Sequence, residues 1–153
     1  MKKAILMLAV SFLFIGTSIA KTDDAKKVSE KCMKKIESFE KTKDSGLKSL
    51  DSYVNATKDI ATTLKSSNKV LNSMEEGKNN GSSLEELTVT LTKLPISIAD
   101  LSSKGDSIIE DCKKESNPMK KAKYVKLAAK TATMLTSLGG EANYQIGIIK
   151  SIQ

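Results

Sequence analysis

The residues that could carry chemistry in this chain are two cysteines, Cys32 and Cys112, several acidic pairs and many lysines. Histidine is absent, which removes the commonest general base and the commonest ligand of zinc and haem. A cysteine nucleophile would therefore need another base, and two cysteines 80 positions apart form no zinc-binding or redox motif. The sequence thus predicts no cysteine-based catalysis and no metal site.

Neighbouring carboxylates are the remaining candidates for acid–base chemistry. Three acidic pairs lie near expected helix ends, at Glu75-Glu76, Glu85-Glu86 and Glu110-Asp111. Sequence neighbours on a helix point in different directions, so these pairs are typical of capping and solvation. We therefore expect a protein that is not an enzyme and has no cofactor, with an enzyme using carboxylates or Lys/Tyr as the alternative.

Cys32 and Cys112 both fall on apolar stripes of expected helices, and an exported chain meets an oxidising compartment. We therefore expect a disulfide bond between them, which would close a loop of about 80 residues and contribute on the order of 4 kcal/mol. An unbroken helical hairpin would hold the two residues roughly 22 Å apart, and parallel packing after a break leaves a mismatch on the order of 18 Å, so the bond requires a tilted first helix or a bent third one. An intermolecular bond and two free buried thiols are the alternatives.

Lysines are concentrated between Lys113 and Lys126, where Glu115 is the one acid. Four lysines share one face of the last expected helix: Lys120, Lys123, Lys126 and Lys130. An ordinary solvated face explains such a stripe. The alternative is a patch for an anionic partner, such as membrane headgroups, an acidic polysaccharide or an acidic protein. Nucleic acid is not expected, because arginine is absent and only Tyr124 is available for stacking.

Five apolar residues of the last expected helix lie away from its main stripe: Leu127, Met134, Leu138, Ile148 and Ile152. A helix that is apolar on more than one side is usually central to its bundle. Otherwise these residues predict a face for a protein partner or a homodimer, or the wall of an apolar ligand cavity.

Apolar residues recur at helical spacing almost throughout, without the sustained alternation of strands. A stripe spaced by four and three runs from Cys32 to Met74 and fails only at Lys43 and Gly46. There the segment KTKDSG predicts a break, with Asp44 or Ser45 as cap, and a single bent helix is the alternative. The segment EEGKNNGSS, residues 75–83, predicts the next loop, and its last serines predict a capping box with Glu85 or Glu86.

A third helix is expected to continue to Cys112 with a kink at Pro95, because proline removes a backbone donor. Asn117 as N-cap and Pro118 as first residue predict the last helix. Its expected buried stripe is Ala122, Val125, Ala129, Ala132, Leu135, Ala142, Ile146 and Ile149. The expected fold is all-α, a small bundle of about four helices with up-and-down character.

The first residues, MKKAILMLAVSFLFIGTSIA, predict a secretory signal peptide over residues 1–20, cleaved after Ala20. A retained N-terminal anchor is the alternative, because the uncharged stretch approaches the length of a spanning helix. Residues 21–153 then form a single helical domain. Without Lys2 and Lys3 this domain has 23 lysines and 18 acids, a net charge of +5.

Richness in lysine, isoleucine, asparagine and serine is typical of an AT-rich genome, and with the short leader it favours a bacterial protein. We expect a periplasmic or secreted protein of the bacterial cell envelope. The expected function is binding, to an unknown protein or to an anionic envelope surface. Peripheral membrane contact and a homodimer are both compatible with this expectation. The alternative is a carrier of a small apolar ligand held between the helices.

Overall fold

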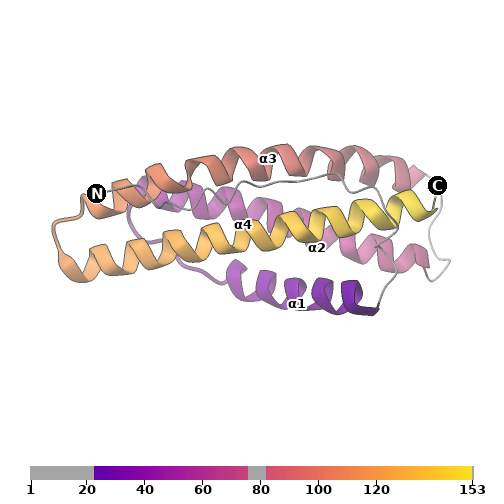
Figure 1. Ribbon diagram of the computed structural model, residues 1–153, viewed down its shortest axis with the longest axis horizontal. Coiled ribbons are helices and arrows are strands. Elements are labelled where there is room, and N and C mark those ends of the chain that lie inside the picture. The colour runs from indigo at the N-terminus through magenta and orange to yellow at the C-terminus, as the bar shows by residue number, and fades with distance from the viewer. Residues whose placement is uncertain (1–22, 76–81, 153) are drawn as a thin grey trace.

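The computed structural model describes residues 23–75 and 82–152. These residues form four α-helices: α1 (Asp23–Glu40), α2 (Lys48–Glu75), α3 (Ser82–Lys113) and α4 (Pro118–Ile152). The helices run alternately in opposite directions, and α2, α3 and α4 lie side by side along the length of the bundle (Figure 1). No strand occurs among the described residues, so the predicted all-α bundle is confirmed. The predicted leader, residues 1–20, lies outside the described part of the chain.

Helix α1 is the shortest of the four and covers only part of the bundle. It packs against α2 and α4 and makes no contact with α3. Figure 1 shows α1 beside the C-terminal half of α4, so that the other end of the bundle consists of α2, α3 and α4 alone. None of the described helices has the length and apolar character needed to cross a membrane.

The break between α1 and α2 occurs where Lys43 and Gly46 interrupt the apolar stripe. Gly46 adopts a positive φ of 90°, a conformation that glycine reaches without steric cost. The carboxylate of Asp51 accepts hydrogen bonds from the backbone N–H groups of Ser45 and Gly46, at 2.6 and 2.9 Å. The hydroxyl of Ser45 accepts from the N–H of Leu47 at 3.1 Å. The predicted break is confirmed, and Ser45 acts together with Asp51 in closing the turn.

The other connections follow local signals. Asn117 caps α4 as predicted, since its Oδ1 accepts from the N–H groups of Met119 and Lys120 at 3.0 and 3.2 Å. Pro118 is the first residue of α4. Pro95 lies inside α3, which continues on both sides of it. The capping box predicted before α3 involves side chains outside the described residues.

The core confirms the predicted stripes of the first three helices. From Cys32 to Met74, and from Leu84 to Cys112, every stripe position is buried or half-buried except Lys43 and Gly46. The largest side chains with no exposed surface include Phe39, Ile36 and Leu50.

The predicted stripe of α4 is wrong over its first half, where Ala122 and Ala129 are exposed. The buried positions are instead Tyr124, Ala128, Thr131, Leu135, Leu138, Ala142, Gln145 and Ile149. They keep the four-three spacing, but two members are polar, so apolarity alone did not reveal them. The buried hydroxyl of Thr131 has a partner within its own helix, because it donates a hydrogen bond to the carbonyl of Leu127 at 2.8 Å.

Candidate functional site

The predicted disulfide is not formed. Cys32 and Cys112 are both buried free thiols. The thiol of Cys32 lies on α4, donating to the backbone carbonyl of Ser137 at 3.5 Å. Burial, and after it the charge of Glu141, raises the pKa of Cys32 to about 11. Burial also raises the pKa of Cys112. Neither thiol is therefore activated as a nucleophile or readily ionised.

The physical reason is the placement of α1. Cys112 lies at the end of α3, close to the turn that leads to Pro118, the first residue of α4. Ser137, beside Cys32, lies about 19 residues further along α4, roughly 28 Å at 1.5 Å per residue. Bridged cysteines have Cα atoms about 4.4 to 6.8 Å apart. Since α1 does not touch α3, neither the expected tilt of the first helix nor a bend in the third brings the thiols together.

The four lysines of the predicted basic stripe are all exposed on the first half of α4. The ammonium group of Lys130 lies 5.9 Å from the centre of the Phe39 ring in α1. Lys120 lies close enough to Glu115 to help lower the pKa of that carboxyl, after the hydrogen bond from the backbone N–H of Asn117. Within residues 23–75 and 82–152, Lys123 and Lys126 have no ion-pair partner. The structure thus keeps the predicted stripe together and open to solvent.

The predicted apolar face of α4 is not exposed as a unit. Met134, Leu138 and Ile148 are buried in the core. Leu127 is half-buried against that core, and only Ile152 is exposed. Helix α4 contacts all three other helices, which explains why it is apolar on more than one side. Four of the five residues therefore pack into or against the core, and Ile152 lies on the surface.

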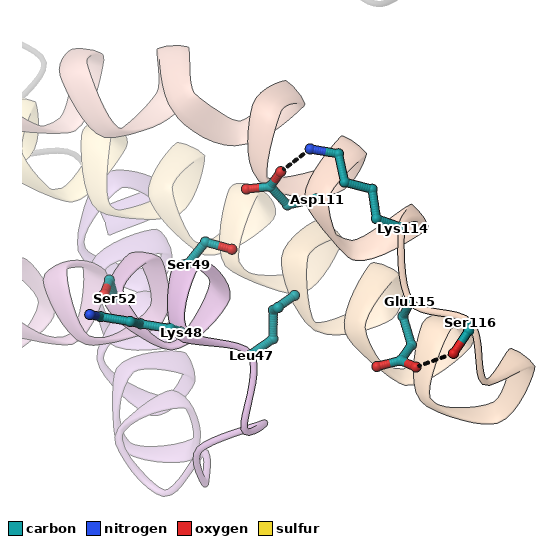
Figure 2. Close-up of a pocket in the computed structure, with 8 residues that line it drawn as sticks. All are labelled: Leu47, Lys48, Ser49, Ser52, Asp111, Lys114, Glu115 and Ser116. Atoms are coloured by element: carbon teal, nitrogen blue, oxygen red, sulfur yellow. Dashed lines mark hydrogen bonds and ion pairs between the residues drawn. The ribbon is translucent and has the colours of Figure 1, made fainter.

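Among the open hollows on the surface of the described residues are two between α2 and α3. The larger, about 760 Å³, lies between the start of α2 and the end of α3 and is lined by Leu47, Lys48, Ser49, Ser52, Asp111, Lys114, Glu115 and Ser116. Figure 2 shows that three of its charged groups interact locally, with Asp111 paired to Lys114 at 2.7 Å and Glu115 hydrogen-bonded to Ser116. The smaller hollow, about 430 Å³, lies between α2 and α3 and is lined mainly by serine and threonine. Polar residue types dominate both linings, which does not favour a carrier of an apolar ligand.

A buried polar cluster between α1, α2 and α4 was not predicted. At its centre Glu141, only 3% exposed, lies in α4. Its Oε1 accepts hydrogen bonds from the hydroxyl of Ser29 at 2.9 Å and from the amide of Gln145 at 2.8 Å. The amide of Asn68 in α2 approaches the same oxygen at 3.5 Å. Burial raises the pKa of Glu141, although these hydrogen bonds oppose the shift.

A weak sequence signal for this cluster exists. Glu141 and Gln145 are one turn apart in α4, and Gln145 continues the four-three frame of Leu138 and Ala142. Polar residues in an apolar helix are usually satisfied inside the fold when they are buried. The partners Ser29 and Asn68 lie far away in the sequence, so no local pattern identifies them.

The described residues contain no group of three or more histidine, cysteine, aspartate or glutamate side chains able to hold a metal ion. Comparison with protein-family models, with curated proteins and with solved structures finds no match. The exposed lysines of α4 are the clearest feature of the described surface.

Proposed function

We propose that this protein is an exported, non-enzymatic binding protein that holds an anionic envelope surface through the first half of α4. The observation that carries the proposal is the exposure of Lys120, Lys123, Lys126 and Lys130 together on one helix. The stripe begins at the end of the bundle that α1 leaves uncovered (Figure 1). A planar anionic surface can therefore approach the first turns of α4.

The energetic scale of this contact follows from the number of lysines. Each lysine near an anionic membrane surface contributes about 1 kcal/mol at physiological ionic strength. Three lysines together then change the affinity on the order of 100-fold. Salt weakens such binding because it screens exposed charges within a Debye length of about 8 Å.

The test compares binding of the mature chain to phosphatidylglycerol-containing vesicles with binding to phosphatidylcholine vesicles, in low and high salt. We expect salt-sensitive binding to the anionic vesicles only. The variant Lys120→Gln/Lys123→Gln/Lys126→Gln should lose it by about 100-fold. A matched control, Lys69→Gln/Lys93→Gln/Lys104→Gln, removes the same charge from exposed lysines of α2 and α3 and should bind within a few-fold of the parent. Absent binding, or equal losses in both variants, would overturn the proposal.

A further inference from the structure

The amide of Gln145 has a defined orientation in the buried cluster. Its Nε2 donates one hydrogen to the backbone carbonyl of Leu64 at 2.9 Å and the other to Glu141 Oε1 at 2.8 Å. Both neighbours are acceptors, so the nitrogen must face them. The amide oxygen of Gln145 then has to point elsewhere.

Two buried acceptors remain without a donor among the described residues. They are Oε2 of Glu141 and Oε1 of Gln145. An ionised Glu141 leaves both orphaned and places an uncompensated charge in the core. A protonated Glu141 carries no charge, so its burial costs much less than that of the carboxylate.

No cation among the described residues compensates an ionised Glu141. Helix α2 presents Asn68 to the cluster and α4 presents Gln145, and neither side chain titrates. Helix α1 presents Ser29 and the thiol of Cys32, whose ionisation the charge of Glu141 opposes. The ammonium of Lys35 is bound 3.4 Å from the hydroxyl of Ser137, and its charge acts on Cys32. Helix α3 packs against α4, but no charge from α3 contributes to the pKa of Glu141.

Helix α1 is the element that shields the Glu141 carboxyl from solvent. Its residues Ser29 and Cys32, 4% and 5% exposed, cover Glu141 from the side of α1. The same helix rests on two neighbours only and joins α2 through residues 41–47, where Gly46 turns the chain. An element with so few neighbours can open without global unfolding.

We propose that the docking of α1 depends on protonation of Glu141: the neutral carboxyl holds the first half of α1 against α2 and α4, and ionisation releases it. When this half of α1 moves away, Glu141 becomes hydrated and gives its proton to water. Opening and proton release are therefore linked. One linked proton makes the opening constant rise by at most tenfold per pH unit. This rise begins near the ordinary pKa of glutamate, 4.5, and ends at the raised pKa of the closed state.

The test uses Cys32 as a reporter, because its thiol is buried until α1 opens. Cys112→Ser leaves Cys32 as the single thiol, and its labelling by methyl methanethiosulfonate is measured from pH 5 to pH 8. The same measurement on Cys112→Ser/Glu141→Gln supplies the control, since glutamine is neutral at every pH. At each pH the labelling rate of Cys112→Ser is divided by that of Cys112→Ser/Glu141→Gln, which cancels the intrinsic reactivity of the thiol. We expect this ratio to rise with pH, by up to tenfold per unit, and a constant ratio would overturn the proposal.

Amide hydrogen exchange on the unsubstituted chain provides a second measurement, which does not depend on the folding of any variant. After correction for intrinsic exchange rates, the protection of residues 25–33 should fall between pH 5 and pH 8. Residues 87–98 in α3 should be better protected than residues 25–33 at every pH, because they exchange only when the whole protein unfolds. Equal protection of the two segments at every pH would reject a local opening of α1.

Discussion

The hydroxyl of Ser29 in α1 donates a hydrogen bond to the carboxylate of Glu141 in α4 across 2.9 Å, and both side chains are buried. The two residues are 112 positions apart in the sequence, so this contact joins the first described helix to the last. The shared oxygen also receives the amide of Gln145, at 2.8 Å. A single carboxylate oxygen therefore accepts hydrogen bonds from both α1 and α4 where the two helices pack.

Glu141→Ala should destabilise the protein, because it leaves the donors of Ser29 and Gln145 without their acceptor. The expected loss in free energy of unfolding is on the order of 2 to 3 kcal/mol, the range for buried polar groups left unsatisfied. Urea unfolding followed by circular dichroism measures it. Glu30→Ala, an exposed site on α1, is the matched control and should change stability by less than about 0.5 kcal/mol.

The pH dependence of stability should carry the sign of a raised glutamate pKa. The folded state holds the proton of Glu141 more tightly than the unfolded state, so this contribution to stability is fully present below pH 4.5. It is lost as the pH rises toward the pKa of the folded state. Glu141→Gln should remove this part of the pH dependence, and urea midpoints at several pH values measure it. A variant with the same pH profile as the parent would contradict the assignment.

Gly105→Ala should destabilise α3 although alanine is the better helix former. A Cβ atom at Gly105 would lie 3.3 Å from the hydroxyl of Tyr53, a buried group with no described partner. We expect a net loss of about 1 kcal/mol, in the lower part of the range for overpacking. Tyr53→Phe in the same chain should restore stability, because it removes both the close contact and an unsatisfied hydroxyl. Thermal unfolding of the single and double variants measures the coupling.

Gly140→Ala is the control for that substitution. A Cβ at Gly140 would meet no atom within 4 Å, and the position is an exposed helix site. Alanine should therefore stabilise the protein by about 0.5 to 1 kcal/mol. Stabilisation of equal size at both glycines would show that Tyr53 does not limit the space at Gly105.

Leu138→Ala should destabilise the protein much more than Ile152→Ala, although the sequence predicted both residues on one apolar face of α4. Leu138 has no exposed surface, so its truncation should cost about 2 to 5 kcal/mol. Ile152 is 43% exposed and ends the helix, so its truncation should cost less than about 1 kcal/mol. Urea unfolding of both variants measures the difference, and similar losses would be inconsistent with a buried Leu138.

Unreduced protein should contain two free thiols. Iodoacetamide at pH 8 should label native protein slowly, since Cys32 is buried and its pKa is about 11. In denaturant without reductant, both Cys32 and Cys112 should be alkylated, and intact mass measures the number of labels. Unlabelled protein whose mass is about 2 Da below that of the reduced chain would mean that the cysteines are bonded.

Local sequence signals determined the helices and their connections. Asn117 and Pro118 begin α4, and Gly46 marks the break before α2, because capping and backbone conformation depend on a few neighbouring residues. The apolar spacing also identified which faces of the first three helices are buried. The lysine stripe was equally predictable, since residues three and four apart share a helix face whatever the fold around them.

The tertiary structure alone decided where α1 rests and what it covers. The position of α1 on α2 and α4 sets Cys32 beside Ser137, far from Cys112, and so leaves both thiols free. It also buries Glu141 under Ser29 and makes Leu138 part of the core. The physical reason is that the rotation and axial position of a helix depend on packing against residues distant in the sequence. Periodicity shows which residues share a face, but not which helix that face meets.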